Sequence, residues 1–154
     1  MGQITSIDAL EALYGPARPA SLAKVSPVLT PLYREWISAS KFVVIATVGP
    51  EGTDASPRGD DGPVVRIADD RTILIPDWMG NNRLDTLRNI VADGRCSLMF
   101  MVPGCMNVIR VNGKAQVRDD EAMVAAFEKS GRLPKTVIQV TVREAYFQCA
   151  KAVM

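Results

Sequence analysis

In the first part of the chain, hydrophobic residues recur every three to four positions, which is the spacing of amphipathic helices. This spacing is clearest over residues 6–14 and 32–39. A serine stands where the first helix would begin, and a Gly-Pro pair follows its end, as at many helix termini. Prolines between the two stretches keep any other helix short. The pattern predicts a helical N-terminal segment over about residues 1–40.

After this segment the pattern changes to short apolar runs rich in β-branched residues, separated by turn residues. Such runs predict strands with few helices between them. The predicted strands are 42–49, 63–76 as a hairpin with Asp69-Asp70 at its turn, 95–102, 106–117 with a bulge or turn at Asn112-Gly113, and 136–148. The polar run 53–60 is either a strand or a loop. A helix is expected over 119–131, ended by Gly131.

This order of elements predicts a mainly β protein, a mostly antiparallel barrel with small helices at its ends. Neither the GxGxxG pattern of dinucleotide-binding folds nor a Walker phosphate loop is present. A length of 154 residues suits a single domain, so we expect residues 1–154 to fold as one unit.

The amino-acid composition limits the kinds of catalytic site that the chain can form. There is no histidine, which removes histidine-based triads, histidine general bases and most catalytic zinc sites. The acidic pairs along the chain stand at turns and helix starts, so no metal site is expected. The formal net charge is +1, which gives no global field for nucleic acid or membrane binding. Three widely spaced cysteines, no signal-peptide pattern and no long apolar run together favour a cytoplasmic protein.

The stretch "IPDWMGNNRLDTLRNI", residues 75–90, reads as a strand that leads into a helix. Asn82 is a candidate N-cap, with Asp85 reaching back to it, so that the helix begins at about Arg83. Free N–H groups and a guanidinium would then form an anion cradle that Gly80 leaves open. Taken alone, the segment fits a capped surface helix with a solvated arginine better.

Three other arginines interrupt strand patterns in a similar way. Arg66 lies within the apolar run "VVRI", and Arg110 within "NVIRVNG". Ser56 and Arg58 flank a proline in "SPRGD". Each is more often structural when considered alone. Together they suggest several arginines that point into one cleft.

With these residues in view, the order "SPRGD…VVRIADDRTILIPDWMGNNRLDTLRNI…RCSLMFMVPG…IRVNGKAQV" resembles the pyridoxamine 5′-phosphate oxidase-related FMN-binding split-barrel proteins. It is most similar to a bacterial subgroup of FMN-dependent enzymes, over residues 35–150. The resemblance implies a six-stranded antiparallel split β-barrel with small flanking helices. It also implies a homodimer that holds two FMN molecules in clefts between its subunits.

The resemblance further implies which residues hold the cofactor. Arg66 would bind the phosphate, together with polar and basic residues of the "GNNR" junction. The flavin ring would lie along the backbone of two strands, and Ser56 and Arg58 would line the same cleft. Arg58 or Arg110 could stabilise reduced flavin near its pyrimidine edge. The full set of expected cofactor-binding residues is Ser56, Arg58, Arg66, Ile67, Pro76, Asp77, Asn81, Asn82, Arg83 and Arg110.

Two departures from the oxidase itself limit the expected activity. Its junction carries a more basic Ser-Arg-Lys run where this chain has Asn81-Asn82-Arg83, and its C-terminal arm, with an arginine and a histidine, has no counterpart here. Pyridoxamine phosphate oxidation is therefore not expected. The sequence favours an FMN-dependent oxidoreductase acting on a small substrate. The alternatives are a flavin-binding or flavin-sensing module without turnover, a deazaflavin-dependent reductase, and an interaction domain with an empty cleft.

Overall fold

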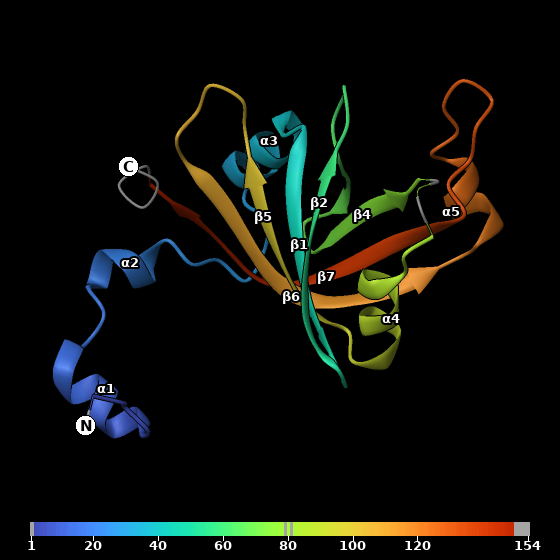
Figure 1. Ribbon diagram of the computed structural model, residues 1–154. Coiled ribbons are helices and arrows are strands. Elements are labelled where there is room, and N and C mark those ends of the chain that lie inside the picture. Colours follow the sequence, from blue (N-terminus) through green and yellow to red (C-terminus); the bar gives the residue numbers. More distant parts are fainter. Residues whose placement is uncertain (1, 79, 81, 150–154) are drawn as a thin grey trace.

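The computed structural model describes residues 2–78, 80 and 82–149 (Figure 1). Three helices precede a curled antiparallel sheet, and two further helices interrupt the strands. The elements are α1 (Ile7–Tyr14), α2 (Pro19–Ala23), α3 (Pro31–Ala39), β1 (Phe42–Gly49), β2 (Gly52–Gly59), β3 (Arg66–Asp69), β4 (Thr72–Asp77), α4 (Asp85–Ala92), β5 (Arg95–Met101), β6 (Val108–Arg118), α5 (Glu121–Ala125) and β7 (Thr136–Gln148).

All seven strands belong to one sheet, in the order β2-β1-β5-β6-β7-β4-β3, and every neighbouring pair is antiparallel. The prediction of a mainly β, antiparallel protein is confirmed, but the count of six strands is wrong. The polar run 53–60 pairs with β1 along its whole length and is a full strand. Among the described residues the sheet is not closed, because β2 and β3 remain as its two edges.

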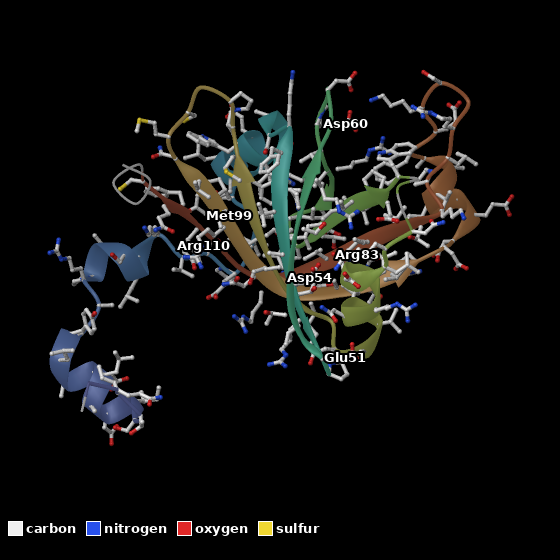
Figure 2. The ribbon with its side chains drawn as sticks, viewed as in Figure 1. Glu51, Asp54, Asp60, Arg83, Met99 and Arg110 are labelled. Carbon is white, nitrogen blue, oxygen red and sulfur yellow. The ribbon has the colours of Figure 1, made fainter. Side chains whose placement is uncertain are left out.

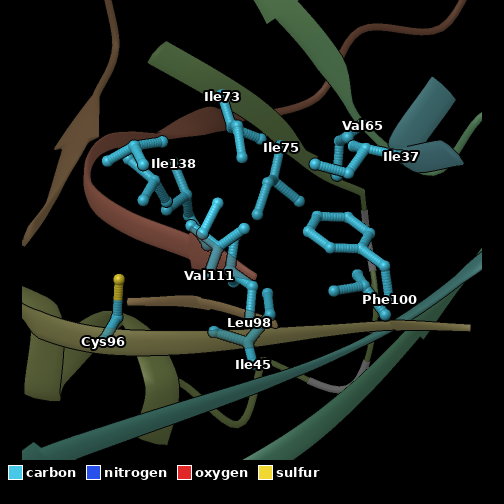
Figure 3. Packing of buried hydrophobic residues seen from close by; sticks show 14 of the residues in the cluster. Ile37, Ile45, Val65, Ile73, Ile75, Cys96, Leu98, Phe100, Val111 and Ile138 are labelled. Carbon is cyan, nitrogen blue, oxygen red and sulfur yellow. The ribbon is translucent and has the colours of Figure 1, made fainter. Parts of the chain in front are cut away.

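The core lies inside the curl of the sheet (Figure 3). Strand alternation sends every second side chain inward, and the pairing keeps these side chains on the same face. On β1, Val43 and Ile45 lie opposite Phe100 and Leu98 of β5, and all four are buried. The end of the curl is closed by α3, which buries Tyr33 and Ile37 on the side that faces the sheet.

The predicted irregularity at Asn112-Gly113 is a β-bulge, where the register between β6 and β7 shifts. A Cβ added at Gly113 would overlap the Thr141 carbonyl oxygen on the neighbouring strand. Only glycine allows the two backbones to approach so closely at this point. The bulge lets two long strands bend with the curl of the sheet.

The helix predicted over 119–131 is much shorter, because α5 ends at Ala125. The Asp120 carboxylate does not cap it and instead accepts hydrogen bonds from Arg118. Ser130 and Gly131 then adopt positive φ angles of 53° and 80°, which a helix does not contain. The residues after α5 therefore form a turn that folds back over β3.

The predicted helical N-terminal segment divides into two parts. Residues from Ser26 onward are attached to the sheet, since Ser26 forms a β-bridge with Ala145 and the Leu29 N–H bonds to the Asp70 carbonyl. Earlier residues form α1 and α2, which bury no side chain and lie apart from the sheet (Figure 1). Within the described residues, no helix has the length and apolar character needed to cross a membrane.

Candidate functional site

A cleft of about 440 Å³ lies beside β3 and β4. The segment after α5 forms one wall of the cleft, and the chain between β2 and β3 forms another. Arg66, Ile67 and Pro76, all expected at the cofactor site, line it. The other lining residues are Ser38, Asp60, Gly62, Pro63, Val64, Val65, Trp78, Phe127, Glu128 and Lys129.

Arg66 is held in place at this cleft by two contacts with the segment after α5. Its Nη1 donates a hydrogen bond to the Ala126 carbonyl at 2.9 Å, and its guanidinium carbon lies 4.3 Å from the centroid of the Phe127 ring. Stacking and the single hydrogen bond fix the plane of the guanidinium and leave other N–H groups available for an anion. The side chain is thus a preoriented cation in a cleft whose lining is partly apolar and partly charged.

Lys129 joins the two walls of the cleft through a pair of aspartates. Its Nζ lies 2.9 Å from Asp60 Oδ1 and 2.8 Å from Asp61 Oδ1. The hydrogen bond from the ammonium lowers the pKa of Asp61 to about 2 and raises that of Lys129. This bridge holds the segment after α5 against the end of β2 (Figure 2 labels Asp60).

Ser56, Arg58 and Asp77 form a second group, on the inner face of the sheet. Arg58 Nη1 lies 2.6 Å from Asp77 Oδ1, and Arg58 Nε donates a longer hydrogen bond, 3.4 Å, to Ser56 Oγ. β2 is one edge of the sheet and β4 is next to the other edge, so this ion pair connects the two ends of the curl. Asp77 directly follows Pro76 of the cleft, which places this group close to the first.

The junction before α4 differs from the prediction. The helix begins at Asp85 and not at Arg83, Leu84 is its N-cap residue, and no side chain caps it. Asn82 has a φ of 59°, in the left-handed region and unlike the extended backbone of an N-cap residue. Asp85 accepts a hydrogen bond from Arg83 Nε at 2.8 Å and does not reach back to Asn82. Asn81 lies outside the described residues.

Arg110 lies at a different place on the molecule. It lines a broader cleft of about 650 Å³ over β1, β2, β5 and β6, on their face away from the core. Its Nη1 bonds to Gln148 Oε1 at 3.3 Å and its guanidinium lies 5.0 Å from the Tyr146 ring centroid. Figure 2 shows Arg110 near Met99, while Arg83 lies next to α4.

The ten expected residues therefore do not share one pocket within a single chain. Of the nine that are described, three line the first cleft, three form the adjacent ion-pair group, and Asn82, Arg83 and Arg110 belong to neither. Their assignment to the cofactor stays a prediction. Sequence reasoning missed Trp78, Phe127 and Lys129 at the first cleft. Trp78 follows Pro76-Asp77 directly and could have been found, but the other two depend on the fold of residues 126–131.

The buried cysteine is a poor candidate for a nucleophile. Burial raises the pKa of the Cys96 thiol to about 11, so its thiolate is scarce at neutral pH. No described group of three or more histidine, cysteine, aspartate or glutamate side chains is arranged to hold a metal ion. A cleft with a cation and aromatic walls suits a bound anionic cofactor better than a reaction carried by these side chains alone.

Comparison with known proteins first defines the class of fold. The sheet resembles HupZ of Group A Streptococcus, at 20% identity and a TM-score of 0.65, over 79% of this chain and 94% of that one. It also resembles General Stress Protein 26 from Bacillus anthracis, at 12% identity and a TM-score of 0.57, over 73% and 88%. An FMN-binding protein from Syntrophomonas wolfei matches at 10% identity and a TM-score of 0.55, over 92% and 95%. At these identities the likeness shows a shared fold and no more.

The family follows from the sequence. The family model described as "Pyridoxamine 5'-phosphate oxidase" matches residues 29–149, which is most of the chain. The chain therefore belongs to the pyridoxamine 5′-phosphate oxidase family, as the resemblance had indicated. No curated protein matches it in a sequence comparison.

Proposed function

We propose that this protein binds FMN and uses it as an oxidoreductase on a small substrate. The observation that carries the proposal is the preoriented Arg66 guanidinium in a cleft walled by Trp78 and Phe127. Membership of the pyridoxamine 5′-phosphate oxidase family supports it, as does the likeness in fold to a protein described as FMN-binding.

The residues of the cleft fit the two parts of this cofactor. A planar ring system needs flat apolar walls, which Ile67, Pro76 and Trp78 offer. A phosphate needs oriented N–H donors with positive charge, and Arg66 offers both. The expected homodimer would bring a second chain to the open side of this cleft, and Arg83 would contribute from the junction before α4.

Bound FMN would supply hydride or electron transfer, so the chain needs no nucleophile or histidine of its own. Its residues have to bind the phosphate, orient the ring and leave one face open to substrate. Arg58 is a candidate for placing positive charge near the ring, because it lies next to Pro76-Asp77. Asp77 neutralises much of that charge, so a modest effect of Arg58 on the flavin potential is expected.

The phosphate contact is tested by comparing FMN with riboflavin, which lacks the phosphate. In Arg66→Met, FMN affinity should fall by about 10- to 100-fold while riboflavin affinity changes little, as expected when one charge-assisted phosphate contact is lost. Arg71→Met is the matched control, because Arg71 lies in the turn of the same hairpin and outside the cleft lining. Equal losses for both flavins in Arg66→Met would show that Arg66 does not bind the phosphate.

Turnover is tested on the flavin-loaded protein. Reduction by NADH or NADPH, followed by reoxidation by an added substrate faster than by oxygen, is expected of an oxidoreductase. A flavin that is reduced and then reacts only with oxygen indicates a binding or sensing module. A protein that stays colourless after incubation with FMN rejects the proposal, and binding of a deazaflavin in its place identifies the other cofactor.

A further inference from the structure

Helix α1 carries an apolar stripe that no described part of its own chain covers. Ile7, Leu10 and Tyr14 stand at i, i+3 and i+7, with Leu13 beside them, so these side chains share one side of the helix. Their exposed fractions are 67% for Ile7, 39% for Leu10, 69% for Leu13 and 79% for Tyr14. A helix of eight residues is marginal in water without a surface to pack on. Such a stripe indicates a docking partner.

Within the described chain, the outer face of β1 and β5 carries small and apolar side chains among polar ones. On β1 and β5 the inward side chains are buried, so alternation sends Ala46, Val48 and Met99 to the outer face. Met99 is 40% exposed. Small residues of β1 and β2, including Ala46 and Ala55, form the floor of the cleft of about 650 Å³ that Arg110 lines. A floor of small side chains leaves room for the larger side chains of a helix.

The charges of the two surfaces are complementary. α1 contains Asp8 and Glu11 and no basic residue. Three arginines stand around the cleft, and two of them are already paired, Arg95 with Asp93 and Arg143 with Glu144. Arg110 makes no ion pair with any described residue; it contacts the Gln148 amide and the Tyr146 ring. Its charge also acts on Glu144 and, after the hydrogen bonds from Asn112 and Arg143, helps to lower the pKa of that carboxyl group. Of the three arginines, it is the one that forms no ion pair within the described chain.

We propose that α1 of one chain docks into the outer-face cleft of a second copy, with its apolar stripe on β1, β2 and β5 and Glu11 beside Arg110. The second copy is favoured over the helix's own chain because α1 lies apart from its own sheet, while the segment from Ser26 onward is packed (Figure 1). The inference rests on the proposed dimer and gives Arg110 a role in assembly in place of the cofactor contact expected from the sequence.

Amide hydrogen exchange of the full-length protein without flavin tests where α1 docks. Protection of the α1 amides should rise with protein concentration in step with dimer formation measured by sedimentation. Protection that does not change with concentration would mean that α1 docks on its own chain, and absent protection, or a chain that stays monomeric, would mean that it does not dock. Either result overturns the proposal.

Substitutions identify the surfaces involved. Leu10→Lys should raise the dimer dissociation constant by more than about tenfold, whereas Ala12→Lys, on the opposite side of α1, should leave it nearly unchanged. Glu11→Arg and Arg110→Glu should each weaken the dimer, and the double variant should recover most of the loss. Equal effects of Leu10→Lys and Ala12→Lys, or no recovery in the double variant, would contradict the docking. Because these measurements use flavin-free protein, they stand even if FMN does not bind.

Discussion

Arg58 on β2 and Asp77 on β4 form an ion pair across the two ends of the curled sheet, with 2.6 Å between Nη1 and Oδ1. The strands do not pair with each other, since β1, β5, β6 and β7 lie between them in the sheet order. Their side chains meet because the sheet curls until its ends approach on the inner face. The pair therefore joins the two ends of the curled sheet beside the proposed cofactor cleft.

Loss of this ion pair should destabilise the fold. Both side chains are mostly shielded, with exposed fractions of 23% for Arg58 and 21% for Asp77. Removing one partner leaves the other charge partly desolvated, so Asp77→Asn should lower the free energy of unfolding by about 1–2 kcal/mol. Urea denaturation of the flavin-free protein measures the change.

The exposed pair Arg143–Glu144 provides the comparison. Arg143 is 74% exposed in this pair, so Arg143→Met should change the unfolding free energy by less than about 0.5 kcal/mol. If Asp77→Asn and Arg143→Met had the same unfolding free energy, the Arg58–Asp77 pair would be a surface contact and not a connection between the sheet ends. A double-mutant cycle with Arg58→Met would isolate the coupling between the two side chains.

Gly113→Ala should also destabilise the protein, through the backbone of the bulge. The added Cβ would overlap the Thr141 carbonyl oxygen, and a backbone atom on a paired strand cannot move away without breaking the ladder. We expect a loss of about 1–3 kcal/mol in unfolding free energy, the usual cost of overpacking. Gly59→Ala is the control, because its Cβ would meet the nearest atom at 3.5 Å, an ordinary contact. Similar stabilities for the two variants would contradict the close approach at Gly113.

Elements with a strong local pattern could be predicted from the sequence. The Ser6 cap, the hairpin around Asp69-Asp70 and the bulge at Asn112-Gly113 each depend on a few neighbouring residues, and the structure confirms all three. Helix starts were predicted wrongly where a carboxylate could bond either to the helix backbone or to a neighbouring arginine. Asp120 bonds to Arg118 instead of capping α5, and Arg83 occupies the Asp85 carboxylate that was expected to reach back to Asn82.

In the candidate site, too, some features could be predicted from the sequence and others could not. Arg66, Ile67 and Pro76 share the first cleft because they lie on paired strands of one hairpin, which the sequence already indicated. The aromatic and cationic wall opposite them comes from residues after α5, about 60 positions further along the chain. No pattern in the sequence shows that Phe127 will lie under Arg66, because the contact joins residues that are distant in the chain.

Thiol reactivity gives a third prediction. Cys105 and Cys149 are exposed, whereas Cys96 is buried in the core with its pKa raised to about 11 by desolvation. At pH 8 a thiol reagent should modify the first two quickly, and Cys96 only as the protein unfolds. A Cys105→Ser, Cys149→Ser variant makes the slow thiol visible alone. Its reaction rate should follow the opening equilibrium as urea is added, and rapid modification in native buffer would show that the core around Cys96 is open.

The bridge between Lys129 and Asp61 should appear in the acid titration of the protein. The hydrogen bond from Lys129 lowers the Asp61 pKa from 3.8 to about 2 in the folded chain. Because the folded value lies below the unfolded one, the pairing contributes stability above about pH 3.8 and this contribution is lost as the pH falls toward 2. Carboxyl carbon chemical shifts, followed by NMR over this range, give the pKa directly.

In Lys129→Met the Asp61 midpoint should move up toward 3.8, since the largest cause of the lowered pKa, the Lys129 hydrogen bond, is removed. Asp93 serves as an internal control, because its pKa of about 2 is set by Arg95 and should not move. An unchanged Asp61 midpoint would mean that Lys129 does not hold this carboxylate in solution. The wall of the cleft formed by the segment after α5 would then depend on the Arg66 contacts with Ala126 and Phe127 alone.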